Sequence, residues 1–345
     1  MAQKAFIFVL VFIVVISATT SSDAQSGRKR PAPEKTTQEK TKTNPEKTIS
    51  DSPNREDQDE VIRVSSAIVS IPVSVADSAG RPIEGLSAKD FLLSIDGEQT
   101  EIEEFSKSES PVKLALLFDN SSSLVIARSF EKRASTKFLR TVLRPEIDSA
   151  ALYSIATEWR LETPLTSNIS TLISAIERMP PPSGATALID GMMAAVDFLQ
   201  REDGRRVMVI ISDGEDTVSD TPFNDLLRKL QSSSIQVFVI KTTAYENYKR
   251  TGSRIISENL RQLTAERRIG EIVRQTGGEV YSPIDDEELE EAFVSIAREL
   301  SRQYILGYYP RAEADDRISF RRISVVINGH KDYVLRTRAG YLGPR

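Results

Sequence analysis

The chain has 345 residues, 39% of them hydrophobic and 28% charged, an ordinary composition for one large domain with a smaller one beside it. The formal net charge of −5 gives no electrostatic reason to bind nucleic acid. The absence of cysteine excludes disulfides, thiolate metal ligands and cysteine nucleophiles, and the single histidine, His330, is the one candidate for a histidine base.

The first 24 residues have the order of an export signal. Lys4 precedes an unbroken apolar run from Ala5 to Ile16, and small residues follow up to Ala24. This run is short for a membrane span, which needs about 20 residues. We therefore expect a signal peptide cleaved after Ala24, with a short anchor through residues 5–16 as the alternative. Both interpretations place the protein outside the cytoplasm, either secreted or periplasmic or anchored in a membrane.

Residues 25–60 are expected to be a disordered polar linker. Lys, Glu, Thr and Pro dominate this segment, and its only aliphatic residues are Ala32 and Ile49. Such a sequence cannot bury enough apolar surface to offset the entropy cost of ordering. The basic cluster at residues 28–30 is interpreted as part of a soluble spacer, with contact to an anionic surface as the alternative.

Residues 61–106 form a region of predicted strands. Apolar and other side chains alternate over residues 69–75, which indicates a half-buried strand. Pro72 cannot donate a hydrogen bond, so we expect this strand at the edge of a sheet. A second strand is predicted over residues 91–95, Asp96–Gly97 favours a hairpin turn, and a third strand is predicted around residues 101–105.

Residues 107–301 alternate buried strands with amphipathic helices. The continuous apolar character of the strands predicts a Rossmann-like α/β fold with a mainly parallel sheet covered on both faces. We interpret residues 245–265 as an inserted loop with a short helix of its own. The predicted strands are residues 112–118, 150–157, 206–212 and 235–240, with a hairpin at 159–165, and the predicted helices are residues 129–143, 169–179, 188–200, 223–231, 267–276 and 286–300.

Residues 302–345 return to strands. They are predicted over residues 303–309, 320–327 and 333–338, and Asn328–Gly329 is placed at a hairpin turn between the last two. Three short strands before residue 106 do not make a core alone. The simplest closure pairs the two terminal sets in one small β-domain, in which the α/β domain is inserted or which flanks it.

Polar residues directly follow two buried strands of the α/β region, and a further one lies in a loop between them. Asp119-Asn-Ser121-Ser-Ser123 comes directly after the strand at 112–118, Thr186 lies in a loop before a helix, and Asp213 follows the strand at 206–212. Ligands of open α/β sheets bind beyond the carboxyl ends of the strands. Two carboxylates and three hydroxyls at that edge are hard oxygen ligands, which suit Mg²⁺, Mn²⁺ or Ca²⁺.

The pattern Asp-x-Ser-x-Ser, then Thr, then Asp-Gly, in this order and on these elements, resembles the metal-ion-dependent adhesion site (MIDAS) of von Willebrand factor type A (vWFA) domains. The flanks resemble a bacterial subfamily called VWFA-related, first described from acidobacterial proteins. The sequence segments that carry this second resemblance are Gly80-Arg-Pro-Ile-Glu-Gly-Leu86, Asp90-Phe91, Asp96-Gly97 and Tyr304-Ile-Leu-Gly-Tyr-Tyr-Pro310.

The resemblance implies a role for each of the five residues. Ser121 and Ser123 would coordinate the metal directly, and Thr186 would do so directly or through water. Asp119 and Asp213 would hold coordinated waters and neutralise the charge of the ion. One position would stay open for an Asp or Glu carboxylate from a protein partner. The sequence departs from many members at Ser122, where they carry Gly, which allows backbone geometries that Ser tolerates less well; this bears on the geometry of the loop and on its metal affinity.

Several other residues have two interpretations. Glu215 and Asp216 are taken as solvated loop charges, with an auxiliary Ca²⁺ site as the alternative. Trp159 is either a contact residue or packed at an edge. His330 is placed in a solvated turn. Tyr304, Tyr308 and Tyr309 are taken as the core and surface of a strand, with a carbohydrate platform as the alternative.

These observations predict an extracytoplasmic, non-enzymatic, metal-dependent protein-binding module, Mg²⁺ being the first choice of metal. One alternative is an envelope scaffold or assembly protein with a metal-independent interface. A metal-assisted hydrolase is the other, although no Gly-x-Ser-x-Gly elbow surrounds Ser121 or Ser123 and His330 lies in a different predicted domain.

Overall fold

The computed structural model describes residues 68–107, 110–254, 259–310, 318–330 and 332–344. These residues belong to one compact unit, Arg63–Arg345. The predicted export segment and polar linker lie outside them. Within the described ranges, none of the helices has both the length and the apolar character that crossing a membrane requires.

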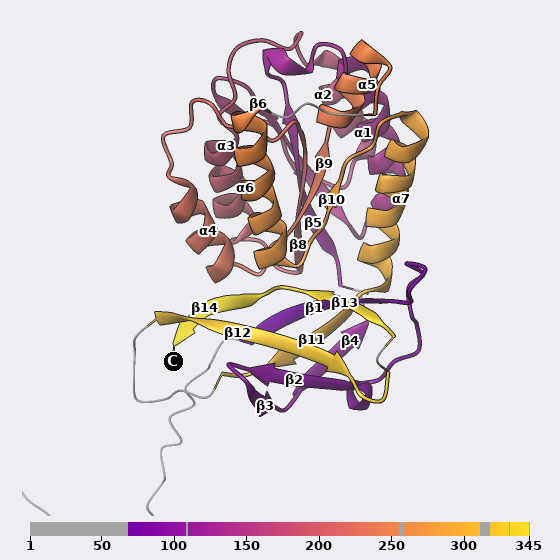
Figure 1. Cartoon of the computed structure of the whole chain (residues 1–345), viewed down its shortest axis with the longest axis vertical. Coiled ribbons are helices and arrows are strands. Elements are labelled where there is room, and N and C mark those ends of the chain that lie inside the picture. Colours follow the sequence, from indigo (N-terminus) through magenta and orange to yellow (C-terminus); the bar gives the residue numbers. More distant parts are fainter. Residues whose placement is uncertain (1–67, 108–109, 255–258, 311–317, 331, 345) are drawn as a thin grey trace, which may run out of the picture. The chain divides into compact units, whose positions relative to one another are not determined.

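A six-stranded sheet forms the centre of the α/β region, and it is parallel except at one edge (Figure 1). This confirms the predicted mainly parallel sheet. The strand order is β10-β9-β8-β5-β6-β7, with β7 antiparallel to β6. The strands are β5 (Val112–Asp119), β6 (Ser149–Ile155), β7 (Trp159–Thr166), β8 (Arg205–Ser212), β9 (Gln236–Lys241) and β10 (Val280–Tyr281), the last of which is too short to give a pattern in the sequence.

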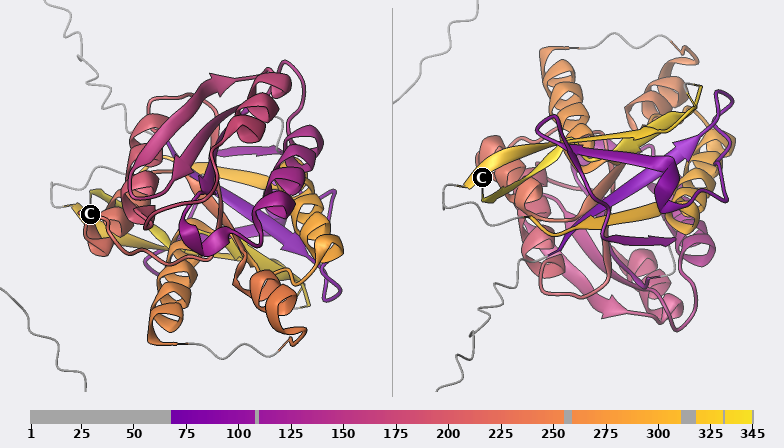
Figure 2. Two further views of the ribbon diagram at one scale, coloured as in Figure 1. Left: turned by 90° about the horizontal axis from the view of Figure 1, so that it is seen from above. Right: turned by 90° about the horizontal axis from the view of Figure 1, so that it is seen from below.

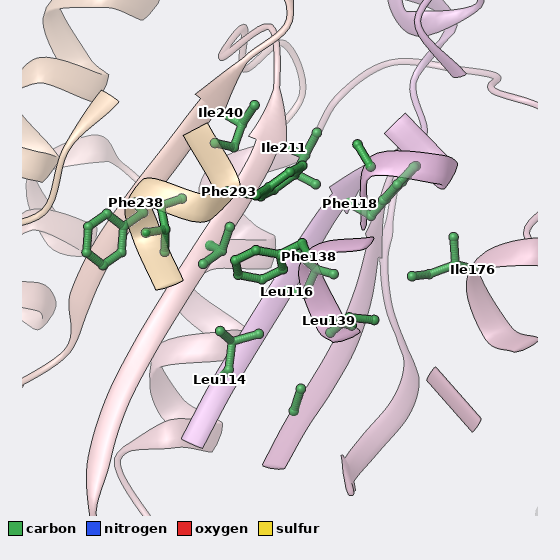
Figure 3. Packing of buried hydrophobic residues seen from close by; sticks show 14 of the residues in the cluster. Leu114, Leu116, Phe118, Phe138, Leu139, Ile176, Ile211, Phe238, Ile240 and Phe293 are labelled. Atoms are coloured by element: carbon green, nitrogen blue, oxygen red, sulfur yellow. The ribbon is translucent and has the colours of Figure 1, made fainter. Parts of the chain in front are cut away.

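Helices cover both faces of this sheet, because alternate side chains of its strands point into two separate hydrophobic cores. Leu114, Leu116 and Phe118 pack with Phe138 and Phe293 of the helices on one face (Figure 3). Ala115 and Leu117 face the other core. The first face is covered by α1 (Arg128–Val142), α2 (Ile169–Arg178), α5 (Thr243–Thr251) and α7 (Asp286–Arg302), and the second by α3 (Leu188–Leu199), α4 (Phe223–Ser232) and α6 (Leu260–Thr276).

The short helix expected within residues 245–265 is present as α5, but this stretch is not an inserted loop. Helix α5 begins directly after β9, and its Tyr245 is buried, with its ring stacked 3.8 Å from that of Phe130. Helix α6 begins at Leu260, earlier than predicted, and Asn259 caps it by accepting from two backbone N–H groups. Most side chains of this stretch are polar, so the few buried positions were not visible as a helical period.

Two four-stranded antiparallel sheets are built jointly from the terminal strands, in the orders β13-β1-β11-β4 and β14-β12-β2-β3. This confirms the predicted closure, and Figure 2 shows the indigo and yellow strands lying beside one another. The strands are β1 (Val69–Ala76), β2 (Phe91–Ile95), β3 (Glu98–Thr100), β4 (Glu104–Lys107), β11 (Tyr304–Tyr308), β12 (Ile318–Ile327), β13 (Val334–Thr337) and β14 (Gly340–Pro344); short 3-10 turns lie at Ala88–Asp90 and Ser122–Leu124.

Strand β1 is not an edge strand, contrary to the expectation from Pro72. It lies between β11 and β13. The carbonyl of Pro72 accepts the Thr337 hydroxyl of β13 at 2.8 Å, so the ring nitrogen also faces β13. The ladder with β13 begins only at Val73. The missing N–H therefore falls just outside that ladder, and no strand hydrogen bond is lost.

Two further expectations for the β-region were wrong. In place of the single strand predicted around residues 101–105, β3 ends at Thr100 and β4 begins at Glu104, and these two strands belong to different sheets. Asn328–Gly329 forms a turn, but β12 and β13 also belong to different sheets and do not make a hairpin. Asp96–Gly97 does form the hairpin between β2 and β3, with both residues at positive φ. Sequence period identifies strands here, but it does not assign them to one of two stacked sheets.

Candidate metal centre

The predicted site lies at the carboxyl edge of the parallel sheet. Strands β5 and β8 are neighbours with Phe118 opposite Ile211, so Asp119 and Ser212 end the two strands side by side. The chain leaves β5 towards β6 on one side, and β8 lies on the other. Strand order thus reverses at β5, and open α/β sheets bind ligands beyond such a reversal.

Backbone hydrogen bonds join the loop after β5 to the loop that carries Thr186. The amide of Ser183 donates to the Asn120 carbonyl at 2.8 Å, and the amide of Ser122 donates to the Gly184 carbonyl at 3.1 Å. The Ser122 hydroxyl donates to the same carbonyl at 2.9 Å. Ser122 has no positive φ, so this residue fits the loop without backbone strain and adds a bond that Gly would lack.

Asp119 is buried and held on both carboxylate oxygens. Its Oδ1 accepts from the amide of Ser121 at 2.9 Å, and its Oδ2 accepts from the Ser212 hydroxyl at 2.5 Å. Ser212 Oγ in turn accepts from the amide of Gly214 at 2.9 Å. Ser212 therefore orients Asp119, a role that sequence reasoning missed. Its signal was a hydroxyl residue at the end of a buried strand, directly before Asp213.

The two serine hydroxyls have the spacing of adjacent metal ligands. Ser121 Oγ lies 3.0 Å from Ser123 Oγ; Ser121 is buried, whereas Ser123 is exposed. Ligands about 2.0–2.1 Å from an octahedral Mg²⁺ lie about 2.9 Å from their neighbours. One ion at the edge of the loop would accept both oxygens with little movement of the chain.

Thr186 and Asp213 lie in loops that bond to each other. The amide of Thr186 donates to the Thr217 hydroxyl at 2.9 Å, and the Thr186 carbonyl accepts from the amide of Thr217 at 2.9 Å. Asp213 Oδ1 accepts from the amide of Glu215 at 2.9 Å. Thr186 is buried, and Asp213 is 9% exposed. The structure thus brings the three predicted segments together at one sheet edge.

The carboxylates of the site repel one another in a buried environment. Burial raises the pKa of Asp119 to about 7, and the charge of Asp213 adds to this rise. Among the described residues, no three His, Cys, Asp or Glu side chains gather as a metal site, so an ion here would depend on the hydroxyls as well. Two carboxylates with three hydroxyls fit a hard divalent cation, which would neutralise both aspartates.

Glu215 and Asp216 differ from the expected solvated charges. Asp216 is mostly buried, and its Oδ1 accepts from the amide of Ile189 at 3.1 Å and from the Ser219 hydroxyl at 2.5 Å. It therefore links the loop after β8 to the first turn of α3. Burial raises the pKa of Glu215, and Asp213 adds to the rise.

None of the remaining candidates is part of these loops. His330 is exposed in the turn after β12, with its ring stacked 4.6 Å from that of Tyr333. Trp159 starts the edge strand β7, is 43% exposed and lies 6.3 Å from the Tyr153 ring. Tyr304 and Tyr308 are buried and Tyr309 is exposed, as predicted for the core and surface of a strand.

Residues 114–277 match the family model of the von Willebrand factor type A domain. No curated protein matches the chain. Among solved structures, an aerotolerance-related membrane protein from Bacteroides fragilis is 20% identical, with 55% of this chain and 98% of that chain covered and a TM-score of 0.43. BatB from Bacteroides thetaiotaomicron is 16% identical, with the same coverage and TM-score. A von Willebrand factor type A protein from Catenulispora acidiphila is 13% identical, covering 81% of this chain and 75% of that chain, with a TM-score of 0.44.

The α/β region is thus a von Willebrand factor type A domain in its fold. A mainly parallel sheet forms its centre, and additional antiparallel sheets are built from the N- and C-terminal strands of the chain. Such domains commonly serve in protein interaction or adhesion and often hold a divalent metal.

Proposed function

We propose that this protein is a non-enzymatic, metal-dependent protein-binding module that acts outside the cytoplasm. In this proposal Asp119, Ser121, Ser123, Thr186 and Asp213 hold one divalent cation, Mg²⁺ as the first choice and Mn²⁺ or Ca²⁺ as alternatives. A protein partner supplies an Asp or Glu carboxylate to it. The observation that carries the proposal is the hydrogen-bonded arrangement in which Ser212 and the Ser121 amide orient Asp119 beside two adjacent serine hydroxyls.

Charge explains why such binding would depend on metal. Asp119 and Asp213 together balance one divalent cation, and the three hydroxyls add no charge. An incoming carboxylate would displace a water and gain a direct ionic contact. Without the ion, the same carboxylate would face two others in a partly buried site, which is strongly unfavourable.

Exposed apolar side chains surround this edge of the sheet and support a protein as partner. Val125 and Ile126, on the loop after Ser123, are 63% and 50% exposed, and Val218, on the loop after β8, is 44% exposed. Apolar contacts around a central ionic one are the usual composition of a specific interface. The partner we expect therefore carries its acidic residue within an apolar stretch.

The test is capture of partners from membrane and envelope extracts, followed by affinity measurements on a captured protein. Wild type and Asp119→Ala are each measured in Mg²⁺ and in EDTA. We expect binding only for wild type in Mg²⁺. Asp197→Ala, which removes a partly exposed aspartate on α3, is the matched control and should bind as wild type does. Equal affinity in all conditions would show that the metal site is not the binding surface.

Location is the second part of the proposal. It rests on the order of residues 1–24, which lie outside the described residues. Cell fractionation with N-terminal sequencing should find the protein in a secreted, periplasmic or membrane fraction, beginning after Ala24 if the signal is cleaved. A cytosolic protein with an intact N-terminus would contradict it.

We further propose that the chain belongs with the bacterial VWFA-related proteins. The segments that suggest this occupy defined places in the β-region: Gly80 has φ +75° in the turn after β1, Asp90 ends a 3-10 turn and Phe91 begins β2, and residues 304–308 form β11.

A further inference from the structure

One end of the core between the two antiparallel sheets is polar. Ile323 and Ile327 of β12 belong to this core. Arg321 precedes Ile323 by two residues, so its side chain points to the same face of its sheet. Its Nε lies 2.6 Å from Asp96 Oδ2, and its side chain is only 18% exposed. An inward-facing charged residue departs from an otherwise apolar core and marks this end as a place to look for a binding site.

A cavity of about 500 Å³ opens at this end of the core. Arg321 lines it together with three tyrosines, Tyr308, Tyr309 and Tyr341, and with glutamates from β3 and the stretch that follows it. Pockets that hold small molecules have volumes of about 300–1,000 Å³ and combine aromatic walls with a few polar groups. This cavity has both the size and the composition of such a pocket.

Two of these tyrosines leave one buried proton without a protein acceptor. Tyr308 and Tyr341 come from β11 and β14, which belong to different sheets, and both side chains are buried. Their hydroxyls bond to each other. One bond between two hydroxyls uses one proton, and no other acceptor bonds to either hydroxyl within the described ranges. Buried donors are nearly always paired, so the second proton requires an oxygen from water or from a ligand.

Carboxylates dominate the rim of the cavity. Glu98, Glu101 and Glu103 line it, and all three are exposed. Arg321 is the one cation among the described lining residues, and Asp96 offsets its charge. The rim therefore offers hydrogen-bond acceptors to a ligand and repels an anionic one.

Tyr309 supplies an exposed aromatic face that is already held in place. Its side chain is 40% exposed and lines the cavity. Its backbone N–H donates to Glu103 Oε1 at 3.2 Å, and its hydroxyl donates to Glu104 Oε1 at 2.8 Å. Because both ends of the residue are bonded, little side-chain entropy is lost when a ligand packs on the ring.

We propose that this cavity binds a neutral or amino sugar unit of a glycan. Sugar hydroxyls both donate and accept hydrogen bonds, so they can donate to the carboxylates of the rim and accept the remaining tyrosine proton. The C–H face of a sugar ring can pack on Tyr309, because the face of an aromatic ring carries partial negative charge. This site goes beyond the metal-dependent function proposed above and does not depend on it.

Other ligands fit the cavity less well. A lysine or arginine side chain carries donors only, so it would leave the tyrosine proton without an acceptor and would place a second cation near Arg321. An acidic sugar would bring its carboxylate to the glutamates of the rim, where like charges repel. A ligand with many hydroxyls and no negative charge meets both requirements.

The test is binding of the full chain to an array of defined neutral, amino and acidic oligosaccharides, followed by isothermal titration with the tightest one. We expect binding of neutral or amino oligosaccharides and none of acidic ones. Tyr309→Ala should lower the affinity about tenfold, whereas Tyr309→Phe keeps the ring and should stay within about threefold of wild type. Tyr333→Ala is the matched control, because Tyr333 belongs to the same β-region but stacks on His330 outside the cavity lining.

Glu101→Gln tests the rim without disturbing the fold. Glu101 is exposed and lines the cavity. Replacing its carboxylate with a neutral amide should weaken sugar binding about three- to tenfold, because bonds to charged acceptors are the stronger ones. Glu158→Gln, at an exposed glutamate between β6 and β7, is the matched control and should bind as wild type does.

EDTA and Asp119→Ala separate this site from the metal centre. Neither should change sugar binding, because none of the five proposed metal ligands lines the cavity. Sugar binding that is lost in EDTA would belong to the metal centre and would overturn the proposal. So would wild-type affinity in both Tyr309→Ala and Glu101→Gln, or no binding to any oligosaccharide. Binding of an oligolysine peptide that Glu101→Gln weakens, without sugar binding, would assign the cavity to a basic peptide instead.

Discussion

At the scale of single residues, Ser212 is the side chain that most directly controls Asp119. Its hydroxyl donates to Asp119 Oδ2 and accepts from the Gly214 amide. We expect Ser212→Ala to weaken Mn²⁺ binding at the Asp119 site by roughly 10–100-fold, the usual effect of removing a group that orients a metal ligand. Isothermal titration measures the change.

Ser232→Ala is the control for this prediction. Its hydroxyl also bonds to backbone, the Lys229 carbonyl, but on the exposed end of α4. This variant should bind Mn²⁺ as wild type does. A Ser212→Ala protein with wild-type affinity would mean that the Ser121 amide alone suffices to orient Asp119.

The pKa of Asp119 predicts how the stability of the metal-free protein changes with pH. Burial, with Asp213 adding to it, raises this pKa from 3.8 to about 7. The folded state then binds the proton more tightly than the unfolded state, so the stability contribution is full below the unfolded value and is lost as pH rises through about 7. Across that range the loss corresponds to about 4 kcal/mol.

Urea unfolding in EDTA between pH 5 and pH 8 tests this expectation. The free energy of unfolding should fall as pH rises, and Asp119→Asn should reduce the slope. Some slope should remain, because burial and the charge of Asp213 also raise the pKa of Glu246 to about 7. Saturating Mg²⁺ should also flatten the wild-type curve. An unchanged slope in Asp119→Asn would assign the effect to other groups.

At the scale of elements, the close approach of helix α6 to the loop after β8 requires a glycine. Gly214 has φ +85°, and a Cβ at this position would lie 2.1 Å from Ile269 Cδ1 of α6. Gly214→Ala should therefore destabilise the protein by about 1–3 kcal/mol and displace Asp213. Urea unfolding and Mn²⁺ titration report the two effects.

Gly270→Ala is the matched control in the same helix. Gly270 is exposed in the interior of α6, and a Cβ there would meet nothing within 4 Å. Alanine loses less backbone entropy than glycine on folding, so this variant should gain about 0.5–1 kcal/mol. If both variants behave alike, contact between α6 and the loop does not set the position of Asp213.

At the scale of the whole molecule, strands from the two ends of the chain depend on each other. Removing residues 303–345 deletes both neighbours of β1 and takes β12 from β2. Ile71 and Val73, now fully buried, would become exposed. We expect aggregation in size-exclusion chromatography and loss of amide-exchange protection over residues 69–76.

Two point variants provide a milder form of this experiment. Leu306→Asp places a charge at a fully buried position of β11, whereas Val326→Asp changes a half-exposed position of β12. The first should unfold the β-region and the second should not. A well-behaved truncated protein with unchanged protection in β1 would refute the shared folding unit.

The sequence by itself determined the fold class and which polar segments meet at the edge of the sheet. Buried strands that are apolar on both faces, alternating with amphipathic helices, are typical of the interior of a parallel sheet, and Asp119 and Asp213 lie at the ends of such strands. Since parallel strands end at one edge, their convergence was predictable. The pairing of the terminal strands was also predictable, because neither set could make a core alone.

Only the tertiary structure decided how these pieces are held. Strand period does not say which of two stacked sheets a strand joins, so the place of β1 and the separation of β12 from β13 were not predictable. The sequence shows Ser212 directly before Asp213, but it does not show that the Ser212 hydroxyl bonds to Asp119. Glu131 and Glu246 lie far apart in the sequence on helices with mostly polar surfaces, where a charged residue normally faces water. Only the packing of α1 against α5, in which Phe130 stacks on Tyr245, decides that Glu131 is buried.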